Sequence, residues 1–132
     1  MQRMKVWNMG TYLNPGSGRY EIALHGEIYV DKSQMISYLN SIISTPQRFI
    51  SVSRPRRFGK TMAADMICAY YDRSINSHVL FENKKLADTD NWEVYINAFN
   101  VIRVVMTDFV RVGGNIEQGL GRLKERILEE FQ

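Results

Sequence analysis

The stretch FISVSRPRRFGKTMAADMICAYY, residues 49–71, decides which fold this chain is expected to adopt. Its first five residues are β-branched, aromatic or small, which predicts a buried strand over 49–53. The basic loop RPRRFG follows, and the pattern after it predicts a helix over 60–71. The apolar residues that share one face of this helix are Met62, Met66, Ala69 and Tyr70. The expected unit is therefore strand, basic loop, helix.

The residues before this unit predict a loop, a strand and a helix. TYLNPGSGRYE, residues 11–21, has the proline and glycines of a turn or loop. EIYV, residues 27–30, predicts a short strand. Asp31 and Gln34 stand at the spacing of a capping box, so the Asp31 carboxylate is expected to cap a helix that ends before Pro46.

The residues after the unit predict two more helices and a second strand. Asp90 and Glu93 mark a helix start, and VIRVVMT, residues 101–107, is then expected to be a parallel strand reached by a right-handed crossover. A last amphipathic helix follows the glycine pair at 113–114. The predicted fold class is α/β, a parallel sheet with flanking helices. The chain stops at Gln132 after few strands, so we expect an N-terminal piece of a larger domain, with a small complete α+β domain as the alternative.

Composition narrows the class of protein. The chain has 132 residues, 45% of them hydrophobic and 23% charged, which is typical of one globular domain. The net charge of +3 is too small to require a nucleic-acid partner. The single cysteine, Cys68, excludes an internal disulfide, and we expect a reducing, cytoplasmic setting. No apolar stretch is long enough to predict a membrane span or an export signal.

Gly59, Lys60 and Thr61 carry the main functional signal. They follow a predicted strand and open a predicted helix, which is the context of a phosphate-binding P-loop. In that role Lys60 contacts the β- and γ-phosphates, and the Thr61 hydroxyl is a ligand of Mg²⁺. The match is incomplete, because the general pattern has glycine where this chain has Arg54, and Pro55 has no N–H to donate.

The charge of the loop supports an anionic ligand. Arg54, Arg56, Arg57 and Lys60 lie within seven residues at the positive end of the predicted helix. Such crowding is easier to understand if a polyanion lies among the charges. Two alternatives use the same residues differently: a solvated basic loop, and a nucleic-acid-binding module that tracks phosphates with RPRRFGK. A third is an inactive interaction fragment with an exposed apolar face.

At this point the sequence resembles the bacterial AAA-ATPase-like family of predicted P-loop ATPases. The likeness rests on SRPRRFGKT, a Walker A variant, and extends to MGTYLNPG, YVDKS, AYYDRS and LFEN, so it covers nearly the whole chain. In that family an arginine is usual at the position of Arg54. The resemblance implies one P-loop AAA-ATPase-like domain over 1–132, with an N-terminal segment over 1–48 and a P-loop βαβ region over 49–132.

The resemblance also implies a ligand set and a limit. ATP and Mg²⁺ are the implied cofactors, with Thr61 at the metal and a phosphate-binding set that consists of Arg56, Arg57, Phe58, Gly59, Lys60 and Thr61. Members of the family carry an acidic Walker B strand later in the sequence, often followed by a nuclease-like domain that is a possible contact to nucleic acid. We therefore expect nucleotide binding, an ATPase only in the full-length protein, and little or no turnover by this chain alone.

Several other residues have weaker functional signals. Asp108 ends an apolar run and is a weak Walker B candidate, with a helix or turn cap as the alternative. Tyr29 or Lys32 is a hypothesis for the base pocket. Cys68 is expected to be an inert, partly buried thiol. His25 and His78 are isolated in sequence and are expected at the surface or in caps.

Overall fold

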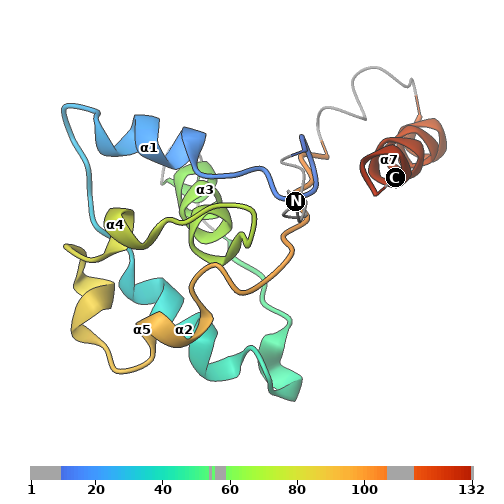
Figure 1. The fold of residues 1–132 in the computed structure, drawn as a ribbon. Helices are drawn as coiled ribbons and strands as arrows, with labels where there is room; N and C mark the ends of the chain where they lie inside the picture. The colour runs from blue at the N-terminus through green and yellow to red at the C-terminus, as the bar shows by residue number, and fades with distance from the viewer. Residues whose placement is uncertain (1–9, 54, 56–58, 107–114, 132) are drawn as a thin grey trace, which may run out of the picture.

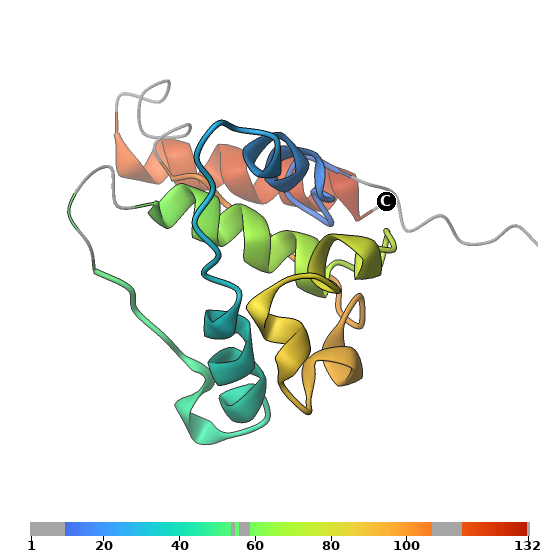
Figure 2. The same ribbon diagram turned by 90° about the vertical axis from the view of Figure 1, so that its left-hand side faces the viewer.

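The computed structural model describes residues 10–53, 55, 59–106 and 115–131. Within these ranges the chain is helical (Figures 1 and 2). The elements are α1 (Gly18–Leu24), α2 (Gln34–Ile42), η1 (Pro46–Arg48), α3 (Lys60–Tyr71), α4 (His78–Phe81), η2 (Lys85–Asp88), α5 (Trp92–Tyr95) and α7 (Ile116–Glu130).

The predicted α/β fold class with a parallel sheet is wrong for the described residues, which form no strand. They contain two isolated bridges, an antiparallel one between Leu13 and Ile102 and a parallel one between Asp72 and Phe99. The partial P-loop sheet expected around residues 49–53 is therefore not seen. The side chain of Phe49, expected in the interior, is 81% exposed.

The strand predictions failed because a strand exists only when a neighbour pairs with it. Residues 49–53 are without regular secondary structure, and so are residues 27–30. The second expected strand is engaged elsewhere. The Asn14 N–H donates to the Val101 carbonyl over 2.7 Å, and the Arg103 N–H donates to the Tyr12 carbonyl over 2.8 Å. The N-terminal residues therefore take the backbone partners that a parallel neighbour would need.

The longer helices follow the sequence pattern. Residues 60–71 form α3 with the predicted bounds, and α2 ends before Pro46 as predicted. The last amphipathic pattern forms α7. Two α-helices were missed: the loop predicted over residues 11–21 turns into α1 at Gly18, and no helix was predicted where α4 forms.

The core is built around α3, which both views place between α1 and α2 (Figures 1 and 2). Tyr20 of α1 stacks on Phe81, with ring centroids 5.3 Å apart, and Tyr70 meets the same ring edge-on at 5.4 Å. Asn40 of α2 is buried beside them. Its amide nitrogen donates to the Tyr70 hydroxyl over 2.9 Å, and its oxygen accepts from Tyr71 over 2.5 Å. This polar contact fixes α2 against α3.

The C-terminal end of α3 is held by a buried carboxylate. Asp72 has no exposed surface, and its Oδ2 atom accepts from the Gly16 N–H over 2.7 Å. Its Oδ1 atom accepts from the backbone and the hydroxyl of Ser74 over 2.8 and 2.6 Å. Asn97 donates from its side chain to the Asp72 carbonyl over 2.8 Å. Three chain segments are thereby fastened at one point.

No helix among the described residues is long and apolar enough to cross a membrane.

We predict that Asp72→Asn lowers the free energy of unfolding by about 1–3 kcal/mol, the cost of leaving a buried hydrogen-bonding group unsatisfied. The asparagine NH₂ group would face either Gly16 or Ser74, and both present N–H donors to this side chain. Urea denaturation followed by circular dichroism measures the change.

Asp90→Asn is the matched control, because Asp90 is exposed and its substitution should leave the urea midpoint unchanged. An equal midpoint for both variants would show that Asp72 does not hold the end of α3.

Candidate functional site

The start of α3, formed by Gly59, Lys60 and Thr61, has the open geometry of an anion site. Gly59 precedes the helix with φ 80° and ψ 23°, a left-handed conformation that favours glycine. No side chain caps this end among the described residues, and the first turn contains no acidic residue. Among the described residues, the Ala63 N–H is the first of this helix to have an acceptor, the Gly59 carbonyl at 2.9 Å. The N–H groups of Lys60 and Thr61 have no acceptor in the described part of the chain, and N–H groups at a helix start are typical ligands of an anion.

The structure places half of the predicted phosphate-binding set. Gly59 precedes α3, and Lys60 and Thr61 form its first turn with exposed side chains, so both can reach a ligand in solvent. Arg56, Arg57 and Phe58 lie outside the described residues, as does Arg54. The roles of Lys60 at the phosphates and Thr61 at Mg²⁺ stay predictions.

Lys32 joins this group from a distant part of the sequence. A methyl group added at Gly59 would lie 2.8 Å from the Lys32 Nζ atom, so the ammonium group lies directly against the α3 start. The sequence offered Lys32 as a hypothesis for the base pocket. The structure places its amine at the end of α3 predicted for the phosphates.

The neighbours of Lys32 explain its position. The Asp31 carboxylate accepts from the Ser33 and Lys85 N–H groups, each over 2.8 Å, and the Ser33 hydroxyl accepts from the Leu86 N–H over 3.0 Å. Burial works to raise the pKa of Asp31, but these hydrogen bonds outweigh it and hold the pKa below its ordinary value. Asp31 was predicted to cap α2, whereas it fastens the segment to η2 and so fixes the backbone that carries Lys32.

Tyr29, the other base-pocket hypothesis, is engaged with α1. Its hydroxyl lies 2.7 Å from that of Tyr20, and the two rings meet edge-on with centroids 6.2 Å apart. The Lys84 amine lies 5.5 Å from the centre of the Tyr29 ring. These contacts give Tyr29 a packing role in this structure.

A cavity of about 180 Å³ lies along α3, beyond its start. Asp65 and Cys68 line it from the helix, and both share the face of Thr61 by their spacing. Arg103 lines it as well and forms an ion pair with Asp65. Burial, and then the charge of Arg19, lower the pKa of the Arg103 guanidinium. No pattern in the sequence indicates this ion pair, because its partners are 38 positions apart.

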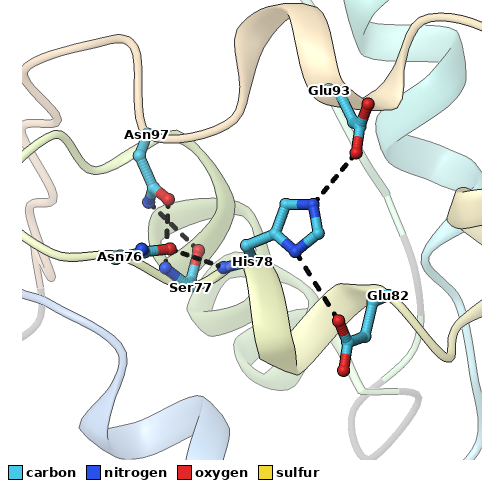
Figure 3. A network of polar contacts seen from close by, with 6 residues as sticks. All are labelled: Asn76, Ser77, His78, Glu82, Glu93 and Asn97. Atoms are coloured by element: carbon cyan, nitrogen blue, oxygen red, sulfur yellow. Dashed lines mark hydrogen bonds and ion pairs between the residues drawn. The ribbon is translucent and has the colours of Figure 1, made fainter.

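Two other candidate residues have ordinary surroundings. Cys68 is a free thiol and is buried, where the sequence predicted a partly buried one. Figure 3 shows the His78 ring between two carboxylates, with Nε2 at 3.0 Å from Glu93 and Nδ1 at 3.7 Å from Glu82. These side chains are largely exposed, so the pairs are surface contacts. No group of three His, Cys, Asp or Glu side chains in the described part of the chain could hold a metal ion.

The chain matches a known protein family. A protein-family model described as predicted AAA-ATPase matches residues 19–132. This range contains the α3 start and Lys32. Neither the curated proteins nor the solved structures contain a match to this chain.

We predict that Cys68 reacts slowly with iodoacetamide in the folded chain. Burial, and then the charge of Asp72, raise its pKa from the ordinary 9.0 to about 11. At pH 9 the thiolate fraction, and with it the alkylation rate, should be about fiftyfold lower than in the urea-unfolded chain. Mass spectrometry measures the rate, and similar rates in the two states would contradict the burial of Cys68.

We predict that Gly59→Ala lowers the free energy of unfolding by about 1–2 kcal/mol, the cost of a left-handed conformation for an L-residue. The added methyl group must also displace the Lys32 amine. Gly18→Ala is the control, since a methyl group there meets nothing within 4 Å. Urea denaturation compares the two variants, and an unchanged Gly59→Ala midpoint would disprove the left-handed turn.

Proposed function

The chain belongs to the predicted AAA-ATPase family, and on that basis we propose that it binds Mg·ATP at the start of α3. Membership of the family indicates ATP binding in general. The finer proposal names the residues: the phosphates contact the loop from Arg56 to Gly59 and the first turn of α3, as expected for a variant Walker A loop. Lys60 supplies the charge at the phosphates, and the Thr61 hydroxyl is a ligand of Mg²⁺.

The single observation that carries the proposal is the juxtaposition of Lys32 with the open end of α3. The Lys32 ammonium lies beside Gly59, and Lys60 is the first residue of the helix. Each cation at a helix N-terminus is unfavourable by about 0.3–1 kcal/mol when exposed. A bound triphosphate would make the electrostatic free energy at this end of α3 favourable, because its negative charge interacts with both ammonium groups and with the helix dipole.

Lys32 extends the site beyond the sequence motif. Asp31 and Ser33 hold the backbone on either side of it against residues 85–86, so the amine is directed from a fixed segment. Lys60 approaches from the helix itself. Two cations from separate elements can contact different phosphate oxygens, which favours a polyphosphate over a single phosphate.

The proposal concerns binding, because hydrolysis requires a carboxylate that fixes Mg²⁺ and the attacking water. Asp65 is the acidic residue of α3, and it is already paired with Arg103. Asp108, the Walker B candidate, lies outside the described residues.

We predict that Lys60→Ala weakens Mg·ATP binding by about 10- to 100-fold, the effect of losing one charge-assisted hydrogen bond. Lys32→Ala should weaken it by a similar or smaller factor, and Thr61→Ala should abolish the dependence of affinity on Mg²⁺. Isothermal titration calorimetry with ATP, with and without Mg²⁺, measures all three.

Lys124→Ala provides the charge-matched control, because Lys124 is exposed on α7. It should bind Mg·ATP like the unaltered chain. Equal affinity of Lys60→Ala and Lys124→Ala would overturn the proposed site. Binding of DNA that weakens smoothly with salt and tolerates Lys60→Ala would instead favour the nucleic-acid alternative.

A further inference from the structure

The loop of residues 10–13, here called the N-terminal loop, surrounds a carboxylate with backbone N–H groups. The Thr11 N–H donates to Oε1 of Glu130 over 2.7 Å, and the Leu13 N–H donates to Oε2 over 2.7 Å. The Tyr12 N–H lies between them, at 3.2 and 3.0 Å from the two oxygens. Three successive N–H groups thus converge on one anion, although Glu130 is more than 110 positions away.

Gly10 makes room for the anion. A methyl group at this position would lie 2.7 Å from both Cδ and Oε2 of Glu130. The Gly10 N–H also donates to the Leu13 carbonyl over 2.7 Å, which closes the loop around the carboxylate. The carboxylate is therefore bound by backbone N–H groups, in space that is open because Gly10 has no side chain. Such a site can bind other oxyanions as well as the glutamate carboxylate.

The adjoining cavity carries excess positive charge. Gly10, Thr11 and Tyr12 form part of its lining, together with Arg19 and Arg103. Arg103 is neutralised by its ion pair with Asp65. Within the described ranges Arg19 makes no hydrogen bond or ion pair. Its guanidinium group can therefore bind an anion next to the N–H groups of the N-terminal loop.

The helix that supplies Glu130 is weakly held. Figure 1 shows α7 standing to one side of the other helices. Apolar side chains along it are exposed, with Ile116 at 65%, Leu128 at 60% and Phe131 at 57%. Withdrawal of Glu130 from the loop therefore uncovers little apolar surface, and the carboxylate can be exchanged for another anion at low cost.

We propose that the N-terminal loop, with Arg19 beside it, is a binding site for a small oxyanion, a carboxylate or a phosphate, for which Glu130 is an internal competitor. An external anion takes the three N–H groups, places its remaining charge toward Arg19 and releases the end of α7. This site uses different residues from the proposed Mg·ATP site and does not depend on it.

The test is a titration of Glu130→Ala with sodium phosphate, and separately with sodium acetate, followed by the amide resonances of Thr11, Tyr12 and Leu13 in ¹⁵N–¹H spectra. We expect saturable shifts with a midpoint at least tenfold lower than in the unaltered chain. Glu130→Gln, which keeps the shape but loses the charge, should fall between them. Saturation by one anion alone identifies whether the site takes phosphate or carboxylate.

Two controls make the result specific. Glu129→Ala removes the exposed neighbouring carboxylate and should behave like the unaltered chain. Lys60→Ala combined with Glu130→Ala should keep the response, which separates this site from the start of α3. Unchanged α3 amide resonances show that the variants are folded. The proposal is overturned if neither folded Glu130 variant gives saturable shifts, or if all variants have the same midpoint. It is also overturned if Lys60→Ala removes the response.

Discussion

The buried carboxylate of Asp72 is the interaction on which the described structure depends. It joins the end of α3 to the loop at Gly16 and to the turn at Ser74, and the parallel bridge to Phe99 adds the chain that follows α5. A buried carboxylate is destabilising unless its oxygens accept hydrogen bonds. Each oxygen of Asp72 has a donor, so the group can stabilise the fold. The constraint fixes the direction of α3, and α3 in turn carries Lys60 and Thr61 at its opposite end. The proposed phosphate site is therefore oriented by a polar contact at the other end of α3.

Local signals predicted the longer helices α2, α3 and α7 well, the shorter helices in part and the strands badly. The bounds of α3 follow from Gly59, which ends the loop, and from apolar residues at helical spacing, so neighbours in sequence contain the information. Residues 49–53 have β-branched and aromatic composition, yet composition supplies no partner, and Phe49 remains exposed. Residues 101–103 do find a partner in the N-terminal residues, a choice settled by contacts about 90 positions apart. Helix α1 escaped prediction because Gly18, a poor helix former, begins it.

Some residues of the candidate site could be identified from the sequence, and others only from the structure. Gly59, Lys60 and Thr61 are visible in sequence because a phosphate-binding turn is one continuous segment. Lys32 is visible as part of YVDKS, but its place at Gly59 depends on Asp31 and Ser33 reaching η2, more than fifty positions later. Glu130 was not identified at all, since backbone N–H groups attract a carboxylate without any side-chain pattern. Sequence thus predicts contacts within a segment, and the structure supplies those between segments.

The charge at the start of α3 differs from that at the starts of α1, α5 and α7, whereas α2 and α4, like α3, have no acidic residue in the first turn. Glu21, Glu93 and Glu117 lie in the first turns of α1, α5 and α7, where a carboxylate balances the positive end of the helix. The first turn of α3 has Lys60 in place of an acidic residue, and Lys32 adds a second cation from outside the helix. The N-terminal loop receives an internal anion, Glu130, whereas the described residues place no acidic side chain in the first turn of α3. A bound polyphosphate would supply negative charge at that turn, and its binding would stabilise the folded chain.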